Sequence, residues 1–328
     1  MARVLVAYSP TRIGVDRAGK QRLEVHILST VADVTHALKA RGHKVEGAAL
    51  RRDPRRFLAF VQRFRPQVVF NLCEGVGGEA TLEKNAASLF ELRRLRFTGN
   101  DCLALGICLA KGLTKQILRS VRIDTPDFVT VAVGHELEEH VELPVIVKPA
   151  TSDGSAGITA RSVCKTMEAV RKRIGYVHRW FRQAALVEKY IAGREFQVGL
   201  LGNDEPRVLA VAELSYAGLP KGMPRICSYA AKWQPGSSYY RHTNAVLPAR
   251  IPDAVRQRLQ AAALRTFRLL GMRGYARVDF RMRGNRPQVI DVNPNPDISR
   301  DAGLAKAARH ARISYVELCD RIVRLALE

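Results

Sequence analysis

Apolar and polar positions follow two alternating patterns along the first hundred residues. Residues 4–8 form a short apolar, β-branched run, which predicts a buried strand. In the segment 25–41, apolar residues recur every three or four positions, which predicts a helix. Gly42 can adopt the left-handed conformation that ends such a helix. Apolar runs at 45–50 and 67–70 predict two more strands with a helix between them. This order is typical of an α/β sheet.

The pattern changes twice further along the chain. The segment 101–186 contains a short apolar strand at 144–148, followed by a polar loop rich in glycine and serine at 151–157. The segment 187–328 holds longer alternating strands and ends in helix. We therefore predict three units, 1–100 and the two segments just named, without internal repeats or low-complexity linkers.

The strongest chemical signal is a pair of alternating strands in the third unit. Successive side chains of a strand point to opposite faces, so Arg277 and Asp279 share one face of the first strand. In the second strand Asp291 and Asn293 share one face. The apolar residues that alternate with them are predicted to face the other side: Ala276, Val278, Phe280, Ile290 and Val292.

A short turn joins these two strands and sets their register. A hairpin centred near Asn285 places Asp279 opposite Asp291, and Arg277 opposite Asn293. Two carboxylates that face each other destabilise a sheet unless a cation lies between them. Two acids and an amide are oxygen ligands that suit Mg²⁺ bound to phosphate. A solvated polar face is the simpler alternative, but the Pro-Asn-Pro motif after Asn293 ends the strand in a shaped loop and favours the metal site.

A second group of residues is suited to a nucleotide. Lys148 ends a buried strand, and the backbone N–H groups of the following loop, 151–157, could bind phosphates. Glu188 and Glu195 lie on later strand-like segments and can accept hydrogen bonds from an amino group and hydroxyls. No Walker-type phosphate loop occurs in the sequence. Taken alone, a plain surface turn and exposed strand residues explain these features equally well.

Composition narrows the class of protein. The net charge is +22 over 328 residues, but the arginines are spread along the chain as they are on solvated helix faces. Anionic substrates such as nucleotides account for part of this charge, and a nucleic-acid partner is disfavoured. No apolar run is long enough to span a membrane, and no secretory leader is evident. The six cysteines lack metal-binding or disulfide spacing, so we expect a cytoplasmic protein.

The order of these features resembles the ATP-grasp superfamily and, within it, the D-alanine–D-alanine ligases. The resemblance covers nearly the whole chain and rests on these segments: Thr98-Gly99-Asn100, 110–115, 125–128, 144–149, 188–195 and 277–293. It implies a mixed α/β (α+β) fold, in which a Rossmann-like pre-ATP-grasp domain precedes a two-subdomain ATP-grasp domain. It further implies that ATP binds between the two ATP-grasp subdomains, with the metal site in the second.

The resemblance assigns nucleotide and metal ligands residue by residue. The nucleotide residues that it implies are Lys115 and Lys148 for the phosphates, Glu188, Lys189 and Ile191 for adenine, Glu195 for ribose, and Lys232 in a mobile loop. It also implies two Mg²⁺ ions, replaceable by Mn²⁺. The implied metal ligands are Asp279, Asp291 and Asn293, and Asp291 stands where the family usually has a glutamate.

The resemblance also implies a reaction and its catalytic residues. A carboxylate attacks the γ-phosphate of ATP, and an amine then displaces phosphate from the acyl phosphate. Arg277 corresponds to the arginine that stabilises the acyl phosphate and the tetrahedral species, and Ser155 belongs to the phosphate-covering loop. Glu24 is the candidate for binding a substrate ammonium. Such a site works by placement and charge neutralisation and needs no covalent nucleophile.

Five positions depart from the family pattern where the amino-acid substrates are expected. Glu74 replaces the histidine of a His-Gly pair, and Gly154 and Trp233 replace a serine and a tyrosine. Asp297 replaces a small loop glycine, and Ala302 replaces the serine that binds the second substrate's carboxylate. These changes remove a hydrogen-bond donor and add negative charge. We therefore expect D-alanine to be a poor second substrate and a neutral or cationic amine to be preferred.

Three functions remain open from the sequence. The first is a D-alanine–D-alanine ligase or near relative. The second is a ligase of the same chemistry that uses other amino acids or a peptide acceptor. The third is a nucleotide-binding or nucleic-acid-associated protein without ligase turnover, which the intact set of Arg277 and the three metal-ligand candidates disfavours. A homodimer stays open.

Overall fold

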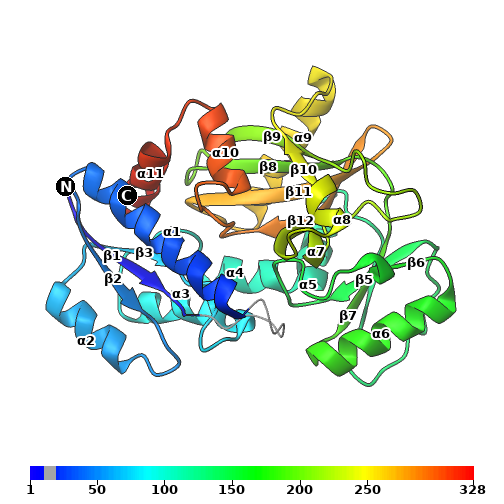
Figure 1. Ribbon diagram of the computed structural model, residues 1–328, viewed down its shortest axis with the longest axis horizontal. Coiled ribbons are helices and arrows are strands. Elements are labelled where there is room, and N and C mark those ends of the chain that lie inside the picture. Colours follow the sequence, from blue (N-terminus) through cyan, green and yellow to red (C-terminus); the bar gives the residue numbers. More distant parts are fainter. Residues whose placement is uncertain (11–19) are drawn as a thin grey trace.

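Three β-sheets form the framework of the protein (Figure 1). The computed structural model describes residues 1–10 and 20–328, with side chains described outside 20–26. The sheets alternate with helices along the chain, so the predicted α/β fold class is confirmed. Within the described residues, no helix is both long and apolar enough to span a bilayer.

The first sheet is parallel and has helices on both faces. Its strands lie in the order β2-β1-β3, with β1 Arg3–Tyr8, β2 Lys44–Ala49 and β3 Val68–Leu72. Apolar side chains of α1 (Lys20–Ala40) and α11 (Tyr315–Leu327) cover one face. Those of α2 (Arg55–Phe64) and α3 (Glu83–Leu92) cover the other, as parallel sheets require. All three predicted strands and the predicted long helix are confirmed, and Gly42 has φ +80 after that helix.

The second sheet is antiparallel and small. Its order is β4-β7-β5-β6, with β4 Phe128–Val131, β5 Val145–Pro149, β6 Val163–Cys164 and β7 Ala185–Lys189. Helix α6 (Met167–Phe181) covers one face, and the side chain of Thr166 caps its first turn. Two helices precede the sheet, α4 (Cys102–Leu109) and α5 (Lys111–Ser120). Strand β5 is the predicted strand that leads into the glycine-rich loop.

The third sheet carries the predicted hairpin. Its order is β10-β9-β8-β11-β12, with β8 Glu195–Leu201, β9 Arg207–Ser215, β10 Asn244–Val246, β11 Tyr275–Arg283 and β12 Arg286–Asn293. Helix α9 (Asp253–Leu269) packs its apolar residues on one face. Two short helices, α7 (Tyr229–Trp233) and α8 (Ser238–His242), lie between β9 and β10 in the chain. In Figure 1 they lie beside the second sheet, near β5.

The C-terminal helices return to the N-terminal sheet. Helix α10 (Gly303–His310) packs against the third sheet, where Leu304 contacts Gly199 closely, and α11 packs against α1. The imidazole of His43 lies 2.9 Å from a carboxylate oxygen of Asp320 across this contact. One hydrophobic core therefore joins the first sheet, both C-terminal helices and part of the third sheet. The first and third sheets fall within the predicted units 1–100 and 187–328, whereas β7 of the second sheet crosses the predicted boundary at 186/187. The boundaries between the units stay a prediction.

Candidate active site

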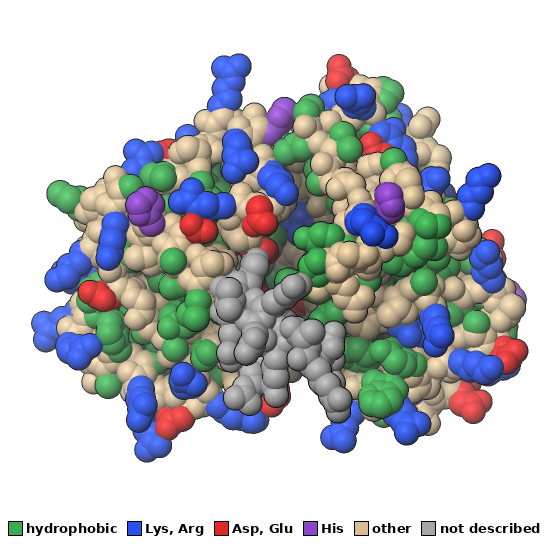
Figure 2. All heavy atoms as spheres, in the orientation of Figure 1, with side chains coloured by type: hydrophobic (Ala, Val, Ile, Leu, Met, Phe, Trp, Pro, Cys, Tyr) green, Lys and Arg blue, Asp and Glu red, His purple; other side chains and the backbone are tan. Residues whose placement is uncertain are grey.

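A cleft lies between the second and third sheets and encloses about 850 Å³, open solvent at its mouth included. Figure 2 shows the surface hollowed near the middle of the molecule. Most residues expected at the nucleotide and metal sites line this cleft: Lys148, Ser155, Glu188, Lys189, Ile191, Glu195, Lys232, Asp279, Asp291 and Asn293. Lys115 lines a smaller adjoining pocket.

The hairpin of β11 and β12 has the register predicted from its pattern. Arg277 pairs with Asn293, and Asp279 pairs with Asp291. The opposite face of β11 is apolar and fully buried against α9. This burial of one face fixes the register, because a slip by one residue would turn every polar side chain into the core.

One residue of the hairpin lies on a different face from the one predicted. A β-bulge lies beyond the Asp279–Asp291 pair, because Phe280 pairs with Val289. Val289 therefore takes the buried position, whereas Ile290 is partly exposed and lines the cleft. The prediction that Ile290 faces the core was wrong, since strict alternation does not allow for the extra residue that a bulge inserts.

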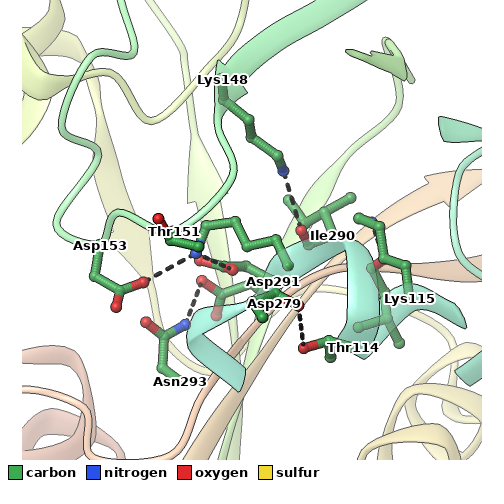
Figure 3. A network of polar contacts seen from close by, with 12 residues as sticks. Thr114, Lys115, Lys148, Thr151, Asp153, Asp279, Ile290, Asp291 and Asn293 are labelled. Atoms are coloured by element: carbon green, nitrogen blue, oxygen red, sulfur yellow. Dashed lines mark hydrogen bonds and ion pairs between the residues drawn. The ribbon is translucent and has the colours of Figure 1, made fainter. Parts of the chain in front are cut away.

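Asp279 is buried and paired with Arg277. The guanidinium donates to both carboxylate oxygens, at 2.7 and 2.9 Å. The amide nitrogens of Asn293 and Gln197 each lie 3.5 Å from the same Asp279 oxygen (Figure 3). Burial raises the pKa of Asp279, and the charge of Arg277 only partly opposes that effect.

Asp291 is paired with Lys111, a cation to which the sequence analysis gave no role. The ammonium of Lys111 lies 3.2 Å from Oδ1 of Asp291 and donates to Asp153 at 2.9 Å. Burial would raise the pKa of Asp291, but the charges of Lys111 and Lys148 outweigh it and lower this pKa to about 2. Lys111 belongs to a segment on which the family resemblance rests. It is the first residue of a helix, where a lysine is unfavourable, and this could have marked it as a site residue.

These ligands fit a magnesium ion that also binds phosphate. Asp279 and Asp291 face each other, and Asn293 adds an amide oxygen at the end of the same strand. No group of three or more His, Cys, Asp or Glu side chains suited to a metal occurs within the described part of the chain. Two carboxylates and an amide leave coordination positions for phosphate oxygens and water, as Mg²⁺ sites in phosphoryl-transfer enzymes require.

Two buried lysines meet at one carboxylate. The ammonium groups of Lys115 and Lys148 lie 3.0 and 3.1 Å from Oε2 of Glu188. Each lysine also donates to a backbone carbonyl of β12, Lys115 to Val289 and Lys148 to Ile290, both at 3.3 Å. Burial and the nearby charge of Lys148 lower the pKa of Lys115 to about 8, although Glu188 acts in the opposite direction. The pair can neutralise phosphate charge beside the metal-ligand candidates.

The expected adenine and ribose residues have partners that the sequence did not predict. Arg281 forms a buried ion pair with Glu195, and the hydroxyl of Tyr216 donates to the same carboxylate oxygen at 2.7 Å. Arg281 also donates to the carbonyl of Ile191 at 2.9 Å. The ammonium of Lys189 points to Glu142, at 2.9 Å. Arg281 thus connects several residues on this side of the cleft. The sequence analysis could have identified Arg281 from its position on the polar face of β11.

The glycine-rich loop 151–157 is fastened to the segment around α7. The hydroxyl of Ser155 donates to the carbonyl of Cys227 at 2.8 Å, and the indole of Trp233 donates to the carbonyl of Gly154 at 3.0 Å. Gly154 has φ +63, a conformation that glycine adopts without strain. Lys232 is exposed on α7. Both segments line the cleft, so their contact closes one side of it.

Acidic residues gather where the amino-acid substrates are expected. Burial, together with the charges of Asp153 and Glu74, raises the pKa of Glu83 well above its usual value, although Glu83 is also hydrogen-bonded to Asn295. The carboxylate of Asp297 accepts from the backbone N–H and the hydroxyl of Ser299, at 2.8 and 3.0 Å.

Two further predicted positions belong to this region. Ala302 is the N-cap residue of α10 and offers no side-chain cap. The side chain of Glu24, the expected ammonium-binding residue, lies outside the described residues.

Comparisons with known proteins identify the family and the fold. The sequence profile described as "D-ala D-ala ligase C-terminus" matches residues 117–324. A D-alanine–D-alanine ligase of Moorella thermoacetica is 33% identical over 92% of this chain and 94% of its own length. One of Gluconobacter oxydans is 33% identical over 89% and 91%. A crystal structure titled as the Bacillus anthracis D-alanine–D-alanine ligase complexed with ATP has the same fold, with a TM-score of 0.78 at 20% identity, and covers 99% of this chain and 98% of its own.

Proposed function

The chain belongs to the D-alanine–D-alanine ligase family of ATP-grasp enzymes and is an ATP-dependent ligase that forms carbon–nitrogen bonds, and from this premise we propose roles for its residues and a class of acceptor. Lys115 and Lys148 bind the ATP phosphates in the cleft. Asp279, Asp291 and Asn293 hold magnesium, two ions in the full complex, and Mn²⁺ can replace them. Magnesium, when bound, neutralises the charge of the transferring phosphate.

The single observation that carries this assignment is the pairing across the hairpin. Asp279 lies opposite Asp291, and Arg277 lies opposite Asn293, within one cleft that Lys148 also lines. Opposed carboxylates on neighbouring strands are unfavourable without cations. Their presence beside a buried lysine pair supports a site for a metal and phosphates.

The protein's groups then position two successive displacements. A substrate carboxylate oxygen attacks the γ-phosphorus and the bond to ADP breaks, while the two lysines stabilise the charge on the phosphate oxygens. The amine nitrogen of the second substrate attacks the acyl carbon, loses its proton, and phosphate leaves. Arg277 stabilises the oxyanion of that tetrahedral species. Ser155 keeps the loop over the cleft through its bond to Cys227, and water is thereby excluded from the acyl phosphate.

Two further assignments concern the adenine and the ribose of the nucleotide. The segment with Lys189 and Ile191 binds adenine together with Glu188, and Glu195 binds the ribose. The buried partners of Glu195, Arg281 and Tyr216, support this role because they fix the carboxylate at the cleft wall. Lys232, on the segment that closes over the loop, adds positive charge near the phosphates.

We propose that the acceptor is an amine that lacks a free carboxylate. Asp297 and Glu74 place negative charge in the acceptor region, and Ala302 offers no hydroxyl at the start of α10. The charges of Asp153 and Glu74 also act on the buried Glu83, where they add to the effect of burial in raising its pKa. A buried donor or acceptor left unpaired costs about 1–3 kcal/mol, enough to change substrate preference by one to two powers of ten.

The setting of the reaction is also part of the proposal. We expect the enzyme in the cytoplasm, where ATP is available and free cysteines persist, and all six cysteines are free thiols in the structure. Its partners are ATP and amino-acid or peptide substrates. A homodimer stays a prediction.

Phosphate release from ATP with a panel of single and paired amino acids tests this function. Product masses identify the dipeptide formed. Release only with D-alanine supports a D-alanine–D-alanine ligase in the narrow sense, and release with other amino-acid pairs supports a ligase of the same chemistry with different substrates. Release that is strongest with amidated acceptors supports the proposed acceptor class. No release with any substrate at saturating magnesium would contradict turnover by this chain.

A further inference from the structure

Lys111 is a buried cation at a place where a cation is unfavourable. It is the first residue of α5 and is only 6% exposed. The N-terminus of a helix carries partial positive charge, so a lysine there is destabilised by the helix itself. Burial of an ammonium adds a desolvation cost. Compensating negative charge must therefore lie close to the Lys111 side chain.

Two carboxylates from different parts of the fold provide that charge. The Lys111 ammonium lies 2.9 Å from Oδ1 of Asp153 and 3.2 Å from Oδ1 of Asp291. Asp153 belongs to the loop after β5, and Asp291 belongs to β12. Figure 3 shows both carboxylates turned toward the same point between the loop and the hairpin. One ammonium thus bridges the two sides of the cleft.

This bridge occupies the carboxylate that we assign to magnesium. Asp279 is paired with Arg277, and Asp291 is paired with Lys111. A divalent cation that binds Asp291 must therefore compete with a charge already in place. Phosphate oxygens brought by a nucleotide offer Lys111 a new partner and relieve this competition.

We propose that Lys111 is a positioning residue that stands in for the metal at Asp291, so that the metal binds there weakly alone and tightly together with nucleotide phosphates. The inference rests on the proposed function, since it takes Asp291 to be a metal ligand. Before the nucleotide binds, Lys111 pairs with Asp291 and holds Asp153, and with it the loop, against the hairpin. When phosphates enter, the ammonium moves to them and leaves Asp291 to the metal.

Binding of Mn²⁺ alone, without nucleotide, tests the proposal through the loss of the electron paramagnetic resonance signal of free Mn²⁺. The variant Lys111→Met removes the competing charge, so we expect its Mn²⁺ affinity to exceed that of the native protein about tenfold. The variant Asp153→Asn leaves Lys111 entirely to Asp291, so we expect its Mn²⁺ affinity to fall. Both variants break the ion pair between Lys111 and Asp153. If Lys111 had a purely structural role, the Mn²⁺ affinity would therefore change in the same direction in both variants.

Two controls separate this inference from the proposed metal site. Asp291→Asn should abolish tight Mn²⁺ binding in the Lys111→Met background, and equal binding with and without Asp291 would contradict the metal site itself. Lys115→Met removes another buried lysine of α5 whose ion pair is with Glu188, and it should change Mn²⁺ affinity less than Lys111→Met does.

If Lys111→Met does not fold by circular dichroism, Lys111→Gln takes its place. Mn²⁺ binding to the folded variant that is unchanged or weaker, while Asp291→Asn still removes it, would overturn the role of Lys111 alone.

Discussion

The two halves of the candidate site differ in what surrounds their acidic side chains. In the nucleotide and metal half, cations lie beside the carboxylates: Arg277 beside Asp279, Lys111 beside Asp291, and two lysines beside Glu188. In the amino-acid half, burial together with the charges of Asp153 and Glu74 raises the pKa of Glu83. This difference supports our proposal that the first half binds anions and metal and that the second disfavours a free carboxylate. If the proposal holds, phosphoryl chemistry and acceptor choice vary independently on this fold.

The largest expected effect is in the metal half. Replacement of either carboxylate, as Asp279→Asn or Asp291→Asn, removes charge that neutralises the transferring phosphate, so we expect kcat to fall about 10³-fold. The far-UV circular dichroism should be unchanged. Steady-state phosphate release at saturating magnesium measures the effect, and Asp253→Asn on the exposed start of α9 is the matched control. Near-native turnover of both site variants would contradict the assignment.

The next effect concerns the lysine pair. Lys148→Ala removes an ammonium from Glu188 and from the expected phosphate site, so we expect kcat/KM for ATP to fall about 100-fold. The exposed Lys172, on α6, provides the control Lys172→Ala. Initial rates over a range of ATP concentrations give the measurement. A Lys148→Ala enzyme with native kcat and native KM for ATP would rule out this role.

A smaller effect is expected where the loop meets α7. Trp233→Phe removes the indole N–H that donates to the carbonyl of Gly154. A hydrogen bond of this kind contributes about 0.5–1.5 kcal/mol, so we expect kcat to fall up to about tenfold as the loop opens. Trp180→Phe, at a side chain that is 68% exposed, is the control. Proteolysis of the loop no faster in Trp233→Phe than in the control would show that the indole does not fasten it.

The smallest effect is a pH dependence of nucleotide binding. The pKa of Lys115 is lowered from 10.5 to about 8, so its positive charge is lost as pH rises through that value. Phosphate binds the charged form, and ADP affinity without metal should therefore fall by up to about tenfold between about pH 7 and pH 9. Isothermal titration calorimetry gives the affinities. Lys115→Met should bind ADP weakly and without this dependence; the same dependence in the variant would assign it to another group.

Much of the fold followed from local patterns. The strands of the first sheet, its long helix and the hairpin register are set by apolar periodicity and turn residues, which act over short distances. The return of α11 onto α1 could not be predicted, because it depends on complementary apolar surfaces nearly three hundred residues apart. The position of Ile290 was missed for a local reason, since the bulge has no distinct residue signature.

The candidate site was likewise predictable where its residues lie close together in the sequence. The metal-ligand candidates could be predicted because Asp279, Asp291 and Asn293 lie on two consecutive strands of one hairpin. The bridge through Lys111 was not, because Asp153 and Asp291 come from distant segments and meet only in the folded chain. The ion pair of Arg281 with Glu195 likewise joins two strands far apart in sequence.

The contrast between the two halves is tested most directly by comparing acceptors with the same ATP and donor. The measurement is kcat/KM for D-alanine against kcat/KM for D-alaninamide and for basic amino acids as the attacking amine, with product masses confirming the peptide bond. Our account predicts ATP-dependent ligation in which an amidated or basic acceptor exceeds D-alanine by about tenfold or more, because the acidic residues expected near the acceptor disfavour a free carboxylate. Efficient synthesis of D-alanyl-D-alanine, with D-alanine the best acceptor of the panel, would contradict it.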